Sequence, residues 1–227
     1  MVEVREAFIG IDAAKLRNAV AIADAGRDGE VRFLGEVDAS PEGMRRLAAR
    51  LAAKYDRLHF CYEAGPTGYG LHRLLTGLGH HCTVVAPSLI PRRPGDRVKT
   101  NRRDALTLAR LLRAGELTPV WVPDEGHEAI RDLVRARAAA VGTLWVHKQQ
   151  VAAFLLKHGR HFPRKTPWGA RYMRWLQEQK FEHAAHQIVL QEAVEAVRLA
   201  KERVERLERT IEEFVPAWSL APVVRAR

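Results

Sequence analysis

The fold of this chain is decided by the stretch FIGIDAAK at residues 8–15, in which a short apolar run ends at Asp12. The stretch LHFCYEAG at residues 58–65 repeats the pattern, with an apolar run that ends at Glu63 and turn residues after it. Short apolar runs bounded by turn signals are typical of buried strands. An ionised side chain at the rim of a core costs several kcal/mol unless a cation, hydrogen bonds or water compensate it. The two strand-end acids therefore indicate a functional edge of a sheet.

The order of the remaining elements predicts one architecture. Three strands with short connections form an antiparallel meander, and a helix opened by Pro41 leads into the strand that ends at Glu63. A further helix, strand and helix give the order βββαβαβα, which is that of a ribonuclease H-like (RuvC-like) mixed α/β sheet. In that fold the first strand, the fourth strand and the last helix bring acids to one sheet edge. The other expected strands are 6–12, 18–24, 30–37 and 82–86, and the later expected helices are 68–78 and 102–113.

The last of these helices carries a third acid, Asp104, within the stretch DRVKTNRRDALTLARLL at residues 96–112. Carboxylates are the hard oxygen ligands that suit Mg²⁺ or Mn²⁺. Asp12, Glu63 and Asp104 together predict a divalent-metal site for phosphodiester chemistry, in which metal ions stabilise the attacking and leaving oxygens. Taken singly, each acid has another interpretation: Asp12 as a turn cap, Glu63 as a turn residue and Asp104 as a first-turn helix acid.

The charge of the chain favours a polyanion as partner. Its 227 residues include 37 Lys and Arg against 27 Asp and Glu, a net charge of +10. Clustered cations release condensed counterions when they neutralise phosphates, so we expect DNA or RNA. The basic run before Asp104 is expected to guide the scissile backbone past the metal ions, the alternative being a solvated charged surface. The expected nucleic-acid contacts are Arg92, Arg93, Arg97, Lys99, Arg102 and Arg103.

The location of the protein is also constrained. No stretch approaches the roughly 18 apolar residues of a membrane helix, and the amino-terminal residues lack a signal-peptide pattern, so we expect a cytoplasmic, nucleoid-associated protein without membrane contact. Cys61 and Cys82 occupy expected strand positions and are interpreted as reduced core residues. His80, His81 and Cys82 hint at zinc, but no second ligand pair lies at finger spacing.

The second part of the chain has a helical pattern. Proline and glycine residues mark a break, so we expect a ribonuclease H-like catalytic domain at 1–123 and a helical region at 124–227. In residues 187–214 apolar positions recur every three or four residues, which is typical of a long amphipathic helix packing on a partner helix. This coiled-coil-like pattern predicts a homo-oligomer, and the alternative is a helix folded back on its own domain. Two further helices are expected at 128–158 and 171–180.

These motifs resemble the DEDD transposases of the insertion-sequence-110 family. Their three blocks look like GIDAAK at 10–15, YEAGPTGYGLHRLL at 62–75 and the stretch at 96–112. The amino-terminal domain of that family is similar to RuvC-type Holliday-junction resolvases. The resemblance implies DNA strand exchange during transposition, a Mg²⁺-dependent acidic site, and a structured guide RNA that bridges donor and target DNA. It assigns the first, second and last acids of the family to Asp12, Glu63 and Asp104.

The chain departs from that pattern in two places. The third acid of the family would fall three residues before Asp104, where this chain has Asn101, so the expected catalytic set is Asp12, Glu63, Asn101 and Asp104. An amide oxygen can bind a metal without adding charge, so we expect weaker metal affinity. The family also carries a carboxy-terminal domain with a nucleophilic serine, which does not occur before Arg227. We therefore expect a fragment or a decayed copy that does not complete recombination alone.

Two other function classes stay open. An actin-like sugar kinase or chaperone ATPase also begins with a strand running into Gly10-Ile11-Asp12, but it needs a second Asp-Gly-Gly phosphate loop, which this chain lacks. The second class is a catalytically inactive nucleic-acid binder or dimerising regulator that keeps the basic surface and the coiled coil without turnover. Metal titration separates this second class from the enzyme.

Overall fold

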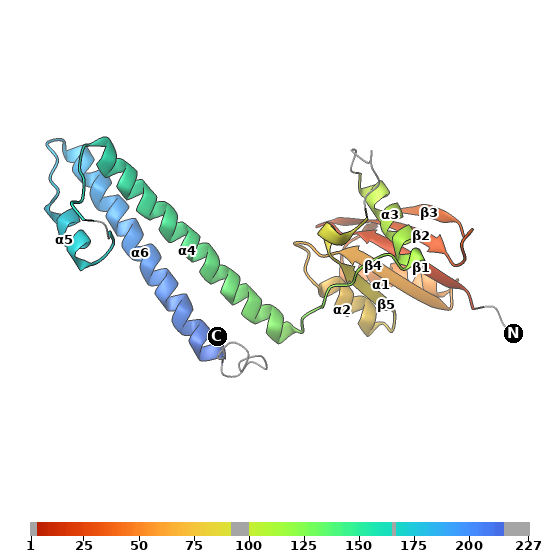
Figure 1. Cartoon of the computed structure of the whole chain (residues 1–227). Coiled ribbons are helices and arrows are strands. Elements are labelled where there is room, and N and C mark those ends of the chain that lie inside the picture. The colour runs from red at the N-terminus through yellow and green to blue at the C-terminus, as the bar shows by residue number, and fades with distance from the viewer. Residues whose placement is uncertain (1–3, 92–99, 165–166, 216–227) are drawn as a thin grey trace. The chain divides into compact units, whose positions relative to one another are not determined.

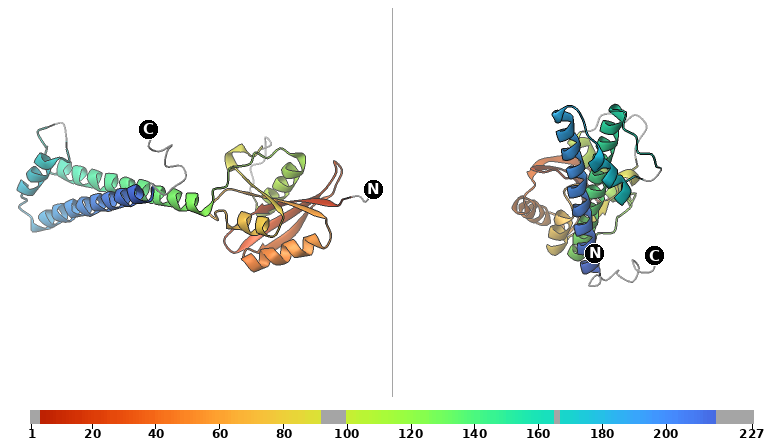
Figure 2. Two further views of the ribbon diagram at one scale, coloured as in Figure 1. Left: turned by 90° about the horizontal axis from the view of Figure 1, so that it is seen from below. Right: turned by 90° about the vertical axis from the view of Figure 1, so that its left-hand side faces the viewer.

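The computed structural model describes residues 4–91, 100–164 and 167–215. The chain consists of two compact units, Met1–Val122 and Pro123–Arg227, which we name the sheet unit and the helical unit. Figure 1 shows the strands in the first and the long helices in the second, and Figure 2 gives two further views. Each unit is described by itself.

The sheet unit contains a five-stranded mixed sheet with the strand order β3-β2-β1-β4-β5. The first three strands pair antiparallel, while β1 with β4 and β4 with β5 pair parallel. This order and these directions confirm the ribonuclease H-like, RuvC-like sheet expected from the sequence. The strands are β1 (Glu6–Asp12), β2 (Arg17–Asp24), β3 (Val31–Asp38), β4 (Arg57–Glu63) and β5 (His81–Val85).

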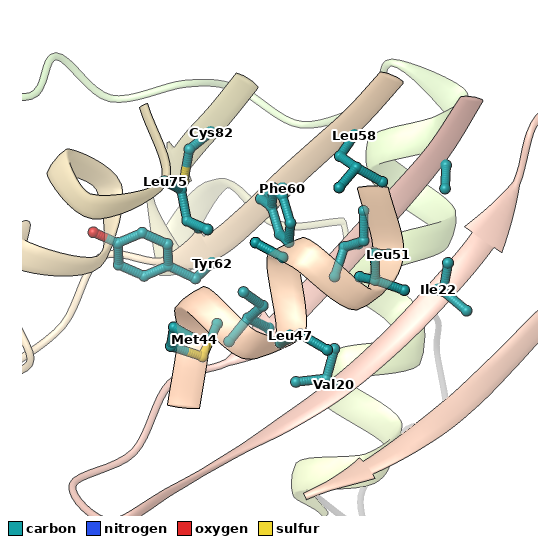
Figure 3. Close-up of a cluster of buried hydrophobic side chains, with 14 of the residues drawn as sticks. Val20, Ile22, Met44, Leu47, Leu51, Leu58, Phe60, Tyr62, Leu75 and Cys82 are labelled. Carbon is teal, nitrogen blue, oxygen red and sulfur yellow. The ribbon is translucent and has the colours of Figure 1, made fainter. Parts of the chain in front are cut away.

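Helices cover both faces of this sheet. Residues of α1 (Pro41–Ala52) and α2 (Gly70–Gly77) join one core cluster with Ile9, Ile11 and Phe60, which Figure 3 shows in close-up. The helix α3 (Asn101–Ala114) packs on the opposite face. Because both faces are buried, β1 reads as a continuous apolar run rather than an alternating one. Full burial of a side chain such as Ile9 contributes about 1.5–3 kcal/mol to folding.

Capping residues set where two of these helices begin. Ser40 accepts a hydrogen bond from the Gly43 N–H at 3.1 Å and precedes Pro41, which suits the first helical position. Thr100 accepts a hydrogen bond from the Arg103 N–H at 3.3 Å. For this reason α3 begins at Asn101, one residue before the start expected from the sequence.

The helical unit consists of α4 (Glu125–Lys157), α5 (Ala170–Glu178) and α6 (Ala184–Phe214). Asp124 caps α4 by accepting a hydrogen bond from the His127 N–H at 2.8 Å, so this helix starts three residues before the expected position. The apolar stripe of α6 packs on α4 of the same chain, and Arg137 pairs with Glu208 across the two helices. The expected partner helix is thus supplied within the chain. The buried stripe residues are Leu190, Val197, Ala200 and Val204.

Among the helices of the described residues, none has both the length and the apolar content required to cross a membrane.

Candidate active site at one edge of the sheet

The parallel pairing of β1 with β4 brings two of the predicted acids together. Ile11 lies opposite Tyr62 in the register, so the next residues along the two strands, Asp12 and Glu63, are neighbours at the carboxyl-terminal edge. Each is the last residue of its strand and is half-buried. The structure therefore places these two acids side by side, and their role as metal ligands stays a prediction.

Both acids lie on the face of the sheet that α3 covers. Side chains alternate along a strand, so Asp12 shares a face with Gly10, and Glu63 shares a face with Cys61. Gly10 contacts the backbone of α3, and Cys61 packs against Leu108 of the same helix. The two carboxylates consequently belong to the layer between the sheet and α3.

Gly10 allows α3 to lie directly on β1. A Cβ atom at this position would lie 2.3 Å from the Ala105 carbonyl oxygen and 2.4 Å from the Ala109 nitrogen. Small side chains continue this close approach, since Ala105 and Ala109 pack against the alanines of β2. The short helix–sheet separation fixes the height of α3 above the strand ends.

The direction of α3 places its first turn at the same edge as Asp12. At the far end of the helix, Arg113 donates hydrogen bonds to the carbonyl oxygens of Asp24 and Gly29, at 3.1 and 2.6 Å. Asp24 pairs with Ala7 at the start of β1. Because Ala105 lies over Gly10 in the middle of β1, the helix runs antiparallel to the strand and its amino terminus points toward Asp12.

Asn101 and Asp104 lie on the sheet-facing stripe of α3. The buried residues of this helix are Ala105, Leu108 and Ala109, and positions 101 and 104 precede them at helical spacing on the same side. Asp104 is half-buried, while Asn101 is exposed. The helix therefore extends one turn past the packed region, with both side chains on the side of the strand-end acids.

Two of the three acids have no cationic partner among the residues that the structure describes. In the described part of the chain, neither Glu63 nor Asp104 forms an ion pair, although both are half-buried. A half-buried carboxylate without a cation is costly for folding and is characteristic of ligand sites. The chemistry of these donors fits a divalent cation.

The three acids do not form a closed ligand set. Across residues 4–91, 100–164 and 167–215, no group of three or more His, Cys, Asp or Glu side chains is close enough together to hold a metal ion. Mg²⁺ typically uses only one or two protein carboxylates, with water and substrate phosphates completing its octahedral shell. The adjacent pair Asp12 and Glu63 fits that mode, and Asp104 lies on α3.

Two buried polar side chains hold the loops that follow these acids. The Asn18 carboxamide oxygen accepts a hydrogen bond from the Ala14 N–H at 3.0 Å. The Tyr62 hydroxyl donates to the Gly68 carbonyl oxygen at 3.0 Å, and burial raises the pKa of this tyrosine. Sequence reasoning missed both anchors. The available signal was Asn18 itself, a polar residue that opens an otherwise apolar strand.

The predicted nucleic-acid contacts fall into two groups. Arg102 and Arg103 are exposed on the first turn of α3, and the Arg102 guanidinium lies 5.5 Å from the centre of the Phe33 ring. Arg92, Arg93, Arg97 and Lys99 lie outside the described residues.

The two cysteines are buried core residues, as expected. The Cys61 thiol donates to the Leu108 carbonyl oxygen at 3.6 Å, and burial raises the pKa of Cys82 to about 12. Both thiols therefore stay protonated at neutral pH.

Two transposases are similar to this chain in sequence. Over 224 residues the chain is 65% identical to a protein of Sinorhizobium fredii named as a transposase, y4qE, covering 99% of this chain and 54% of that protein. It is 29% identical over 212 residues to the transposase for insertion sequence element IS1533 of Leptospira borgpetersenii, covering 92% of this chain and 61% of that protein. The chain thus spans about half to three-fifths of the length of these relatives.

A solved structure, T. thermophilus RuvC in complex with a Holliday junction substrate, matches with a TM-score of 0.31 and 15% identity. The match covers 52% of this chain and 100% of the RuvC chain. A family model described as transposase, that of the insertion-sequence-110 DEDD transposases, matches residues 9–159. That range contains both strand-end acids and α3. The chain belongs to the DEDD transposase family of the insertion-sequence-110 type.

Proposed function

We propose that this chain takes part in breaking and joining DNA phosphodiesters during transposition, through a divalent-metal site at the carboxyl-terminal edge of its sheet. The observation that carries the proposal is the juxtaposition of Asp12 and Glu63 at the ends of paired parallel strands. Family membership implies a divalent metal. The half-buried Glu63 and Asp104, without ion-pair partners in the described residues, support a cation at this edge.

In this proposal each side chain has a role that follows from its position. Asp12 and Glu63 hold a Mg²⁺ or Mn²⁺ ion, and Asp104 offers a further carboxylate from α3. The bound metal supplies charge stabilisation for the attacking and leaving oxygens of a phosphodiester. Asn101 offers a neutral carbonyl oxygen where the family has an acid, so it orients a ligand without adding charge. The anchored loops after Asp12 and Glu63 hold the carboxylates in place before DNA arrives.

DNA would approach across the first turn of α3. Arg102 and Arg103 are exposed there, beside the proposed metal ligands, and arginine binds phosphate oxygens with paired N–H donors. The basic residues Arg92, Arg93, Arg97 and Lys99, just before this turn, would extend the same surface. Such contacts position the backbone and carry no sequence information themselves.

Two further partners belong to the proposal. A structured guide RNA is implied by the family resemblance and is supported by the net charge of +10. A second copy of the chain is supported by large apolar side chains that stay exposed on α4: Val134 (47%), Val141 (39%) and Trp145 (62%). Large apolar side chains exposed side by side indicate a surface that contacts another protein.

A plasmid-nicking assay tests the proposal. The full chain is incubated with supercoiled DNA and Mn²⁺, and binding to the same DNA is measured in Ca²⁺. We expect metal-dependent nicking that Asp12→Asn and Glu63→Gln abolish, with DNA binding retained. Asp132→Asn, which changes an acid on α4, is the matched control and should nick as the parent does.

The same assay tests the alternative function. A catalytically inactive nucleic-acid-binding regulator is favoured by the absence, within the described residues, of a closed group of three metal ligands. DNA binding that is indifferent to metal, together with no nicking by the parent chain, would establish that function and remove the enzymatic one.

A further inference from the structure

A cleft opens on the face of the sheet opposite α3, at the same edge as the strand-end acids. Its volume is about 400 Å³. Most of its wall is apolar, and a single charged side chain lines it. The residues used below are Ala13, Asn18, Met44, Arg45, Leu71 and Leu74.

Asn18 gives this cleft a hydrogen-bond donor whose acceptor within the protein is weak. The side chain is 3% exposed, and its oxygen is identified by the bond that it accepts from the Ala14 N–H. In the described part of the chain, the Asn18 Nδ2 group donates a hydrogen bond only to the Met44 sulfur, at 3.4 Å. A thioether is a weak acceptor, and an amide nitrogen carries two N–H donors. Buried donors are nearly always satisfied, so this one points to an acceptor brought by a ligand.

The wall of the cleft selects the shape of that ligand. Met44, Leu71 and Leu74 provide apolar surface from α1 and α2, which suits the face of a flat ring. Arg45 supplies the positive charge. Small-molecule sites typically have volumes of about 300–1,000 Å³ and combine apolar walls with a few polar groups, as this cleft does.

We propose that this cleft binds one unstacked nucleobase of the DNA strand held at the acidic edge. The base would lie against the apolar wall and accept a hydrogen bond from Asn18, since every nucleobase carries ring-nitrogen or carbonyl acceptors. The sugar-phosphate would extend toward Arg45. Enzymes that do chemistry on a base take its nucleotide out of the stack and bind the base in a pocket of this kind.

The position of the cleft connects it to the proposed chemistry. Ala13 forms part of its wall and directly follows Asp12 in the chain. A nucleotide that wraps around this sheet edge would have the phosphate on one side of its base near the acids, the phosphate on the other side near Arg45, and the base itself in the cleft. Capture of the base would then fix the register of the strand. This inference rests on the proposed DNA function.

Nuclear magnetic resonance with isolated nucleotides tests the inference without catalysis or a known target. The full chain, labelled at methyl groups and side-chain amides, is titrated with each of the four 2′-deoxynucleoside 5′-monophosphates and, separately, with 2-deoxyribose 5-phosphate. We expect saturable shifts of the Asn18 amide and of the Met44, Leu71 and Leu74 methyls with the nucleotides. The sugar phosphate, which lacks a base, should leave them in place.

Two glycines of α2 provide a matched pair of variants. Gly70 lines the cleft and Gly77 lies at the other end of the helix, and a Cβ at either position meets nothing within 4 Å. Gly70→Phe should fill the cleft and weaken nucleotide binding by about tenfold or more, whereas Gly77→Phe should bind as the parent does. If Gly70→Phe does not fold, Thr67→Phe fills the cleft from the preceding turn.

The outcomes separate this inference from the proposed function. Absence of shifts at Asn18 with every nucleotide, equal shifts with the sugar phosphate, or unchanged binding by both cleft-filling variants would overturn the base pocket. Metal-dependent nicking could still occur in each of those cases. Shifts that need the base and disappear only when the cleft is filled would support it.

Discussion

The sheet unit and the helical unit are stabilised in different ways. In the sheet unit backbones approach closely, as Gly10 and α3 do, and acids such as Glu63 are half-buried without a cation in the described residues. In the helical unit α4 and α6 pack through an apolar stripe, and the glutamates flanking Arg198 pair with it on the surface. Half-buried acids without a cationic partner, held by a tightly packed sheet and helix, indicate a ligand-binding site. Acids that form ion pairs on the surface of a helix indicate a solvent-exposed face instead.

The same substitution in the two units should give opposite results. Gly10→Ala would push a Cβ into the backbone of α3 and should destabilise the sheet unit by about 1–3 kcal/mol or more. Gly142→Ala on α4 meets open space and should stabilise the helical unit by about 0.5–1 kcal/mol. Urea unfolding followed by resolved amide resonances reports each unit separately. Equal effects of the two variants would contradict the close-packing account.

Acid pH should weaken the sheet unit through Asp24. This carboxylate accepts hydrogen bonds from Arg32 and Tyr55, both at 2.6 Å. Burial alone would raise the pKa of Asp24, but these hydrogen bonds outweigh it and lower the pKa below its ordinary value of 3.8. A lowered carboxyl pKa contributes stability above the unfolded-state pKa, and this stability is lost as pH falls through the folded-state pKa.

Asp24→Asn should therefore destabilise the sheet unit by about 1 kcal/mol at neutral pH, a value discounted because Asp24 and Arg32 are about one-third exposed. It should also flatten the pH dependence of stability below about pH 4. The control is Glu195→Gln, whose partner Arg198 lies on the surface of α6. Unfolding curves from about pH 2 to pH 7 check both variants. A pH profile of Asp24→Asn like that of the parent would show that the hydrogen bonds to Asp24 do not set the acid sensitivity of the sheet unit.

Nucleic-acid binding should depend on the first turn of α3. Replacing Arg102 and Arg103 by Ala should reduce the slope of log affinity against log salt by about one to two units, because each lost phosphate contact accounts for roughly 0.9 units on duplex DNA. Arg206 and Arg209 on α6 form the matched control pair. Fluorescence anisotropy at several salt concentrations gives the slopes. A larger reduction of this slope in the control pair would show that the nucleic acid binds to the helical unit instead.

The smallest expected effect is at Asn101. Asn101→Asp adds a carboxylate on the face of α3 that also carries Asp104, so it should lower stability slightly without metal, because like charges repel. It should raise the gain in melting temperature on adding Mn²⁺, since a ligand that binds only the folded state stabilises it. Melting curves of the variant and the parent, with and without Mn²⁺, measure both effects. A metal gain no larger than that of the parent would place Asn101 outside the metal site.

Much of the sheet unit could be predicted from local signals. The run of residues 8–11 before Asp12 carries no polar side chain, so both the buried strand and the acid at its end can be recognised in the sequence. The parallel neighbour of β1 follows from the element order, which put Glu63 beside Asp12. Helix starts were less precise, because Thr100 and Asp124 act as caps through geometry that composition alone does not fix.

The remaining features depend on contacts between distant residues. The role of Gly10 requires knowing that α3 crosses it, and Asn18 reads as a surface residue until its strand is placed in the sheet. The stripe on α6 is compatible with a partner helix in the same chain or in a second copy, and only the packing with α4 assigns it. Periodicity identifies a buried face and does not identify what covers it.

The proposed function depends on a divalent metal that binds at the edge formed by Asp12 and Glu63. Paramagnetic broadening by Mn²⁺ in amide spectra of the full chain tests it most directly, since it reports where the ion is bound without requiring activity. We expect the amides of Ala13, Ala64 and the first turn of α3 to broaden first, and Asp12→Asn to remove the effect. Broadening centred on the helical unit, or broadening that survives both Asp12→Asn and Glu63→Gln, would contradict it.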